Sequence, residues 1–399
     1  MKKLYTISVM ILFIMAGCVG CKQDHSRGNK IITVDVTEKY QKKELILQDF
    51  MDVEYIPLET NDDFLTTGFV EDIGEDIIIV SNRWIQNGDI FIFDRKGKGL
   101  KKINRMGQGG EEYLNISTIT LDENNGEIFV NDDYKNSVLV YDLDGNFKRN
   151  LKHREDIGFF KIYNFDKDNL ICYDGRYSNA GIANDQSFLI ISKQDGSITK
   201  EIQIPFEKKI LTVVIFRDEA TKMTYSAFSS GFNHPIIPFK DNWIITEVSS
   251  DTVYSYSSDH NMNPFITRTP SIQSMDPKIF LFLCMITDRY YFMLTEKKVY
   301  DFGTEQGFPS TNLMYDMKEE AIFEYSIYND DYSYKQNVEF DTRSLNSEIA
   351  SWQLIDTHLL LEDYRSGKLK GKLKEIAAEL DEEDNSVVML IKHKKTLLH

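Results

Sequence analysis

The chain has 399 residues, of which 42% are hydrophobic and 12% aromatic, so it carries enough apolar side chain for a large packed core and is not a disordered chain. Lys and Arg number 46 against 63 Asp and Glu, which gives a net charge of −17 and a pI near 4.9. This balance argues against general nucleic-acid binding and against electrostatic docking on anionic lipid, because both depend on basic surfaces.

The N-terminus predicts an export signal with a lipid attachment site. Lys2 and Lys3 precede a mostly apolar stretch over residues 4–16, which is short for a bilayer span and suits a signal peptide. The small residues before Cys18 resemble a bacterial lipobox, in which cleavage precedes a Cys that then carries diacylglycerol. Cys21 is the alternative attachment residue, and an ordinary secretory signal is the alternative reading of the whole segment.

Three segments follow from this interpretation. Residues 1–17 are the expected signal peptide, residues 18–30 a flexible polar tether, and residues 31–399 the folded domain. Cleavage before Cys18 removes two lysines and no acid, so the mature charge becomes −19. We therefore expect an exported protein that is anchored to the cell envelope by its lipid alone, with the outer membrane as the favoured location.

The body of the chain predicts β-strands. Short apolar runs rich in Ile, Val, Phe and Tyr recur, and turn residues bound them. They are found at 77–80, 90–93, 128–130, 138–141 and 188–191. Turns ending in Gly97, Gly145 and Gly196 connect paired runs, and Gly supplies the positive φ that such hairpin turns need.

The strand pairs repeat. Their turns begin at Asp94, Asp142 and Ser192, so the steps are 48 and 50 residues. A period of about 40–50 residues with several strands per repeat is typical of a propeller blade. At about 45 residues per blade the length allows about eight blades, and length alone does not choose between six, seven and eight.

The later half contains weaker strand pairs and one helical pattern. Residues 243–247 and 251–256 predict one pair, and the runs 290–294, 313–316 and 321–325 predict a further blade. Residues 276–283 fit a short helix or a buried strand. Residues 359–380 predict a C-terminal amphipathic helix, because Leu369, Leu373, Ile376, Ala377 and Leu380 recur at helical spacing, and the helix is expected to be interrupted or to start near Gly367 and Gly371.

Both ends of the folded segment carry apolar strands. We expect a strand within 31–58 to pair near residues 387–391 and to close the ring. Cys172 and Cys284 lie in apolar strand-like runs, so we expect buried free thiols, with a disulfide between them as the alternative.

Several motifs resemble the six-bladed β-propeller lipoproteins of Bacteroides-type bacteria. They are Val53–Thr60, Phe93–Gly97, Gly107–Tyr113, Tyr141–Phe147, Ser250–Tyr254, Thr287–Phe292 and the KLKGKLKEIA stretch at 368–377. Gly110 and Glu111 stand where the family's GQGPGEY-type loop has Pro-Gly. The resemblance implies an all-β fold of six blades with a short C-terminal helix, and its likeness to NHL-type propellers suggests binding by analogy of fold.

The chemistry-bearing residues form no strong catalytic signature. The seven histidines show no HxH or HExxH spacing, and no GxSxG elbow occurs. Acid-rich turns such as Asp142–Gly145 allow calcium, with the central channel as its place, although none matches an EF-hand loop. We expect no cofactor, and we expect Arg105, Glu112 and Tyr113 to face the propeller mouth as ligand contacts.

These observations favour a binding or protein-interaction module, expected to act as a monomer. Its partner would be an envelope glycan, a peptide or another protein, and nucleic acid is not expected. The alternatives are a propeller enzyme of lactonase, glycoside-processing or lyase type with its site in the central channel, and a purely structural or sensory lipoprotein. Exposed aromatic side chains in a groove would favour glycan binding.

Overall fold

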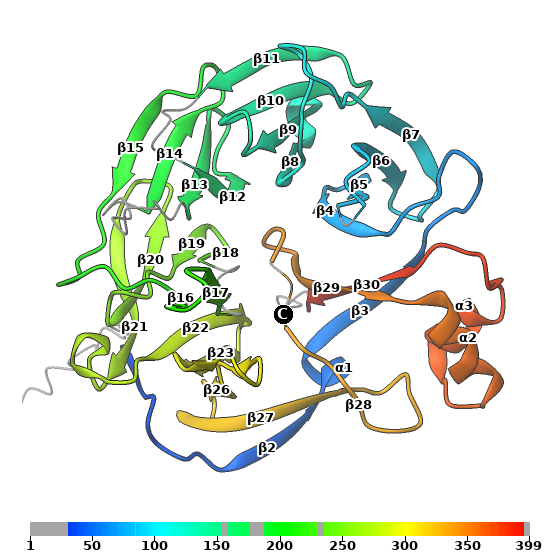
Figure 1. Cartoon of the computed structure of the whole chain (residues 1–399). Coiled ribbons are helices and arrows are strands. Elements are labelled where there is room, and N and C mark those ends of the chain that lie inside the picture. Colours follow the sequence, from blue (N-terminus) through cyan, green and yellow to red (C-terminus); the bar gives the residue numbers. More distant parts are fainter. Residues whose placement is uncertain are drawn as a thin grey trace, which may run out of the picture. The chain divides into compact units, whose positions relative to one another are not determined.

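The computed structural model describes residues 31–83, 85–152, 158–175, 187–229, 235–340, 342 and 344–394. The predicted signal peptide and tether, with Cys18 and Cys21, lie outside these residues. The described part from Ile31 onward is built almost entirely from strands, and it forms six blades around a ring (Figure 1). None of its helices is long and apolar enough to span a membrane.

The first three blades are regular four-stranded antiparallel sheets. Blade 1 contains β4 (Phe69–Ile73), β5 (Ile77–Ser81), β6 (Asp89–Asp94) and β7 (Gly99–Asn104). Blade 2 contains β8 (Thr118–Asp122), the 3-10 turn η1 (Glu123–Asn125), β9 (Glu127–Asp132), β10 (Ser137–Asp142) and β11 (Phe147–Lys152). Blade 3 contains β12 (Phe159–Asn164), β13 (Asn169–Asp174), β14 (Phe188–Ser192) and β15 (Ile198–Ile202).

Blades 4 and 5 take an additional strand from the start of the folded segment. Blade 4 contains β18 (Ile236–Phe239), β19 (Asn242–Ile245), β20 (Thr252–Ser257) and β21 (Met262–Thr269), with β1 (Ile32–Asp35) parallel to β21. Blade 5 contains β22 (Ile279–Ile286), β23 (Tyr290–Lys297), β26 (Ser310–Asp316), β27 (Ala321–Asn329) and β28 (Gln336–Asn337), with β2 (Lys42–Ile46) parallel to β27. The 3-10 turn η3 (Ile272–Ser274) connects these blades, and the segment that fitted a helix or a strand forms the strand β22.

Blade 6 closes the ring with strands from both ends of the chain. It contains β29 (Ile349–Ile355), β30 (Val387–His393) and β3 (Met51–Pro57), which follows the short helix α1 (Leu47–Phe50). The strand β3 pairs antiparallel with β30, and Val53 lies opposite Ile391. The predicted pairing of a strand within 31–58 with residues 387–391 is therefore confirmed, as are six blades rather than eight.

The C-terminal helical pattern forms two short helices, α2 (Thr357–Arg365) and α3 (Gly371–Ala377). The Asp356 carboxylate accepts a hydrogen bond from Leu359 N (3.0 Å) and caps α2. Gly367, with φ of +67°, ends that helix in the left-handed region. The helical pattern is thus interrupted between Gly367 and Gly371, as predicted. Leu369, Leu373, Ile376 and Ala377 of its inner face are buried, and Leu380 is partly buried.

Each interface between neighbouring blades holds its own apolar cluster. Between blades 1 and 2, for example, Ile79 and Ile119 are fully buried beside Leu139. One small sheet cannot bury both of its faces alone, so the blades are stable only when they are packed around the ring. Cys172 and Cys284 are free and buried, as predicted.

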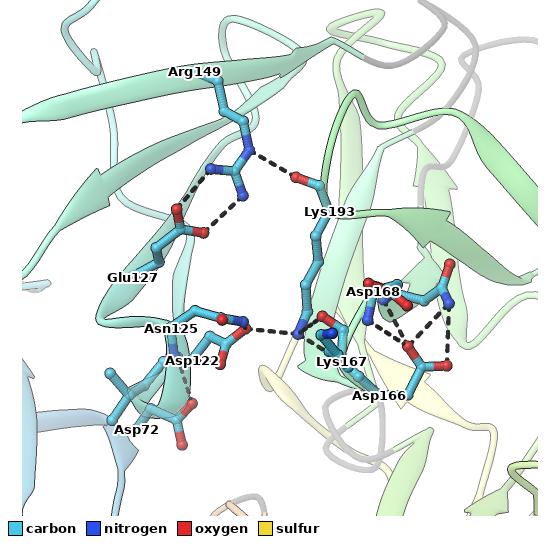
Figure 2. A network of polar contacts seen from close by, with 11 residues as sticks. Asp72, Asp122, Asn125, Glu127, Arg149, Asp166, Lys167, Asp168 and Lys193 are labelled. Atoms are coloured by element: carbon cyan, nitrogen blue, oxygen red, sulfur yellow. Dashed lines mark hydrogen bonds and ion pairs between the residues drawn. The ribbon is translucent and has the colours of Figure 1, made fainter.

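A polar network joins blades 2 and 3 (Figure 2). Arg149 on β11 forms a bidentate ion pair with Glu127 at 2.7 Å and donates from Nε to the carbonyl of Lys193 (2.8 Å). The Lys193 ammonium lies 2.7 Å from Asp122 Oδ2 and donates also to the carbonyl of Asp166 (2.6 Å). Both partners of this lysine–aspartate pair are buried, so the pair is part of the core, whereas Arg149 and Glu127 are partly exposed.

Candidate functional site

Two β-hairpins lie outside the blade sheets. One consists of β16 (Val213–Arg217) and β17 (Thr224–Phe228), and the other of β24 (Tyr300–Asp301) and β25 (Gln306–Gly307). The first lies between blades 3 and 4 in sequence, and the second lies between β23 and β26 of blade 5. Neighbouring strands in a blade are antiparallel, so the connection between two blades and the connection between the second and third strands of one blade lie on the same face of the ring. Both hairpins therefore lie on that face. Figure 1 shows β16 and β17 inside the ring outline, beside β18 and β22.

Polar bonds attach the first hairpin at its base. Ile210 N donates to Ser249 Oγ (2.9 Å) in blade 4, and Lys298 Nζ donates to the carbonyl of Leu211 (2.7 Å). Ser229 N closes the hairpin base by donating to the carbonyl of Thr212 (3.0 Å). The base is thereby fixed to blades 4 and 5, while the strands themselves extend away from it.

The hairpin β16–β17 exposes apolar side chains on both of its faces. Phe216 and Tyr225 are paired on one face and are 47% and 41% exposed. Ile215 and Phe228 point to the other face, because side chains alternate along a strand, and they are 60% and 54% exposed. A two-stranded hairpin is marginally stable in water by itself. Large exposed apolar groups on such an element are typical of an interaction site.

A hollow of about 840 Å³ lies between the two hairpins, and we call it the hairpin pocket. Its size falls in the range of about 300–1,000 Å³ that is usual for small-molecule sites. Four aromatic residues line it: Phe216, Tyr225, Tyr300 and Phe302. Three acidic residues line it as well: Asp218, Asp301 and Glu305. Ser226 and Gly303 are the other described residues of the lining.

The rings of the hairpin pocket form one connected group, in which Phe216 stacks on both Tyr225 and Phe302. The Phe216 ring lies 6.4 Å from that of Tyr225 at an interplanar angle of 26°, and 5.5 Å from that of Phe302 at 27°. Tyr300 meets Phe302 edge-on, with centroids 4.8 Å apart and an angle of 65°. Phe302 therefore joins the two hairpins, and flat ring faces are presented where Phe216 and Tyr225 are exposed.

Two of the acidic side chains are held by backbone hydrogen bonds in their own turns. Asp218 Oδ1 accepts from Ala220 N (2.8 Å) and Thr221 N (3.2 Å). Asp301 Oδ1 accepts from Gly303 N (2.8 Å) and Thr304 N (3.4 Å). Bonds from Thr221 and Ala220 lower the pKa of Asp218, and bonds from Gly303 and Thr304 lower the pKa of Asp301. Both carboxylates are ionised at neutral pH.

The three predicted ligand contacts lie in another loop, between blades 1 and 2. Tyr113 is fully buried, and its hydroxyl donates to the carbonyl of Gly88 (2.6 Å) and accepts from Arg105 N (2.9 Å). Arg105 Nε donates to the carbonyl of Gly145 (2.8 Å). In this structure Tyr113 therefore positions the loop and is not presented to solvent, whereas the role of Arg105 stays a prediction.

Glu112 takes part in holding the glycine-rich turn of the same loop. Its Oε2 accepts from Gly109 N (2.7 Å), and Lys135 Nζ donates to the carbonyls of Gly109 (2.8 Å) and Glu112. A lysine ammonium thus occupies the centre of the turn, and contact of Glu112 with a ligand stays a prediction. By its position between blades this loop leaves from the same face as the two hairpins.

The acid-rich turns use their carboxylates for local structure. Asp142 Oδ1 accepts from Asp144 N (3.0 Å) and Asn146 N (2.8 Å), as expected for an Asx turn.

At the opposite face, a hollow of about 550 Å³ opens at the ring centre, where Glu123 accepts from Asp76 N (3.0 Å) and Ile77 N (3.2 Å). Within the described residues no three His, Cys, Asp or Glu side chains are arranged to hold a metal ion.

A third hollow, of about 380 Å³, lies against α2. Among its lining residues Asp363 accepts from the Tyr334 hydroxyl (2.8 Å) and pairs with Lys368 at 2.8 Å. This hollow therefore combines acidic residues with a lysine, whereas the charged residues in the described lining of the hairpin pocket are all acidic.

The sequence reasoning missed the residues of the hairpin pocket. Phe216 and Tyr225 stand in short apolar runs that belong to neither a repeated strand pair nor a recognised motif. Tyr300 and Phe302 are more than seventy residues further along the chain, so their proximity depends on the ring. The available signal was the presence of strand-like aromatic runs between the predicted blades.

The fold defines the class of this protein as a six-bladed β-propeller. More specifically, the chain belongs to the family described as a domain of unknown function, DUF4934, whose model matches residues 31–392. No curated protein matches the chain.

Solved structures share the fold at low identity. A candidate exported protein of Bacteroides fragilis is 16% identical, with a TM-score of 0.59, over 92% of this chain and 100% of that chain. A member of the DUF4221 family from Bacteroides vulgatus is 11% identical, with a TM-score of 0.40, over 87% of this chain and 98% of that chain. Virginiamycin B lyase of Staphylococcus aureus is 11% identical, with a TM-score of 0.34, over 73% of this chain and 90% of that chain.

Proposed function

We propose that the protein is an exported, lipid-anchored binding module of the bacterial cell envelope, whose ligand binds in the hairpin pocket. The observation that carries this proposal is the pair of hairpins outside the blades, which enclose exposed rings and carboxylates in one hollow. A rigid ring that presents such loops on one face suits recognition, because the scaffold fixes the loops in place.

The anchor is part of the same proposal. Cleavage before Cys18, with Cys21 as the alternative, would leave a tether of about a dozen residues between the lipid and the first strand β1. The protein would act as a monomer without a cofactor, and the likeness to NHL-type propellers fits a binding role. Its ligand would belong to the envelope, and nucleic acid would not be a partner.

Site-specific photo-crosslinking in cells tests the binding role. A photoreactive residue at Phe216 is expected to give specific adducts in the envelope fraction, because this side chain is exposed in the hairpin pocket. The same residue at Tyr134, which is 69% exposed on the β9–β10 turn, is the matched control. Equal adducts at the two positions, or none at Phe216, would contradict the proposal.

Metabolic labelling with a palmitate analogue tests the anchor. The Cys18→Ala variant is expected to lose the label and the Cys21→Ala variant to keep it. The opposite result would assign Cys21. Label that survives both single substitutions and their combination would show that neither cysteine carries the lipid.

A further inference from the structure

Among the described residues, the charged groups that line the hairpin pocket all have one sign. They are the acidic side chains Asp218, Asp301 and Glu305, and this described part of the lining includes no Lys, Arg or His. The chain as a whole carries −17. An anionic ligand would be repelled from such a site, and a neutral ligand would gain nothing from the uniform charge.

Two lysines near the pocket residues in sequence are engaged elsewhere. Lys222 forms an ion pair with Glu219 at 2.8 Å, and Lys298 donates to the carbonyl of Leu211 (2.7 Å) at the base of the hairpin. Arg217 follows Phe216 on β16 and therefore points to the opposite face of the strand. The acidic groups of the pocket thus line it together with the rings, and its described lining residues include no cation.

The faces of the aromatic rings also favour a positively charged ligand. Phe216 stacks on both Tyr225 and Phe302, and the π faces of the exposed Phe216 and Tyr225 rings carry negative charge density that attracts cations. Carboxylates beside such faces add direct Coulomb attraction. Aromatic rings combined with acidic groups form the arrangement that binds ammonium and guanidinium groups in other proteins.

We propose that the hairpin pocket binds the positively charged side chain of a lysine or arginine in a basic peptide segment. The inference rests on the proposed binding function and names its ligand class. A neutral glycan, which could also stack on the rings, is the competing outcome. The apolar flank at Ile215 and Phe228 would contact the remainder of such a segment.

Binding of defined probes to the purified full-length chain tests the inference. The probes are pentalysine, its side-chain-acetylated form and the neutral sugar maltopentaose, measured by titration calorimetry at low and high salt. We expect pentalysine to bind and the acetylated peptide and the sugar not to bind. We also expect the affinity to fall as salt rises, because salt screens exposed charges.

Two kinds of variants locate the binding. Asp301→Asn keeps the turn-forming Oδ1 and removes the charge, and Tyr225→Leu keeps apolar volume and removes the π face. Each is expected to weaken pentalysine binding by roughly 3- to 30-fold, the range that one cation–π or close charge contact provides. The matched controls are Asp62→Asn and Tyr134→Leu at exposed positions elsewhere, and each should change the affinity less than twofold. Near-ultraviolet circular dichroism verifies that each variant is folded.

The outcomes separate this inference from the proposed function. Equal weakening by the pocket and control variants would mean general attraction to an acidic surface and would overturn the inference. Binding of maltopentaose that is lost in Tyr225→Leu would overturn the cationic ligand while supporting the binding function. Binding of no probe would overturn the inference, and crosslinking at Phe216 would then decide the proposed function separately.

Discussion

The Lys193 ammonium lies 2.7 Å from the Asp122 carboxylate, and this pair joins blade 2 to blade 3 within the core (Figure 2). The two side chains are only 6% and 3% exposed. Lys193 also donates to the carbonyls of Asp166 (2.6 Å) and Lys167 (3.3 Å), so the charge is compensated and its donors are satisfied. Removing one partner leaves the other as an uncompensated charge in a site that water scarcely reaches.

Lys193→Met is therefore expected to lower the free energy of unfolding by about 3–5 kcal/mol. Urea denaturation at pH 7 measures the change. Adding Asp122→Asn to this variant should restore part of the loss, because the unpaired charge is then removed. The control Lys222→Met breaks the exposed pair with Glu219 and should cost at most about 1 kcal/mol. Similar losses in the two single variants would contradict the argument.

Gly97 connects the hairpin turn of blade 1 to the closing strand of the ring. Its φ is +85°, its carbonyl accepts from Glu59 N (2.7 Å), and an added Cβ would lie 2.0 Å from the Pro57 carbonyl oxygen. Gly126 has a similar φ of +63°, but an added Cβ there meets no atom within 4 Å. An alanine at either position would therefore have the same backbone strain, but only an alanine at Gly97 would also clash with neighbouring atoms.

Gly126→Ala is expected to cost about 1–2 kcal/mol from the left-handed backbone alone. Gly97→Ala should cost about 2–5 kcal/mol, because the closing strand must also move away from the new methyl group. Thermal and urea unfolding of the two variants give the comparison. If the two substitutions cost the same, the close approach of Gly97 to β3 contributes nothing to stability.

Much of the fold could be predicted because its signals are local. Alternating apolar runs and Asp-Gly turns identify the strand pairs of blades 1 to 3, and apolar strands at both ends indicate the closure of β3 on β30. The blade number could not be obtained from length, since hairpins, helices and N-terminal strands occupy much of the chain. The parallel pairing of β1 with β21 joins residues more than two hundred positions apart, and no local pattern encodes it.

The candidate site was harder to predict, because it too depends on contacts between residues that are far apart in the sequence. Phe216 and Phe302 meet only because the ring brings two insertions together. The buried Tyr113 lies in a motif that resembles a recognition loop, but its hydroxyl donates a hydrogen bond to the carbonyl of Gly88. Sequence distinguishes poorly between an aromatic residue that binds a ligand and one that holds a loop, because both occur beside glycines and charges.

The buried thiols should resist alkylation in the folded protein. Burial raises the pKa of Cys284 to about 12, and burial followed by the nearby Asp174 carboxylate raises the pKa of Cys172 well above its ordinary value. Because the thiolate is the reactive form, neither residue should react with iodoacetamide at pH 8 until urea unfolds the chain. Peptide mapping by mass spectrometry reads the two sites separately, and rapid native labelling of either one would contradict the buried placement.

Asp316 is a buried acid whose environment makes stability depend on pH. It is fully buried at the end of β26, where Arg289 binds both of its oxygens (3.1 and 2.9 Å) and Lys43 of the edge strand β2 donates at 3.0 Å. Burial by itself raises the pKa of Asp316, but the hydrogen bonds from Arg289 and Lys43 outweigh it and hold the pKa well below the ordinary value.

A carboxyl whose pKa is lowered in the folded state stabilises that state fully above its unfolded pKa of about 4 and loses this contribution as pH falls further. Asp316→Asn should therefore cost about 1–3 kcal/mol at pH 7 through its weaker bonds to the two cations. The difference from the parent chain should shrink progressively below about pH 4, as protons bind the unfolded parent but not the variant at this position. Urea unfolding of both chains at several pH values measures this difference. A difference that stays constant down to pH 3 would mean that the ion pair of Asp316 with Arg289 and Lys43 does not contribute to stability through its charge.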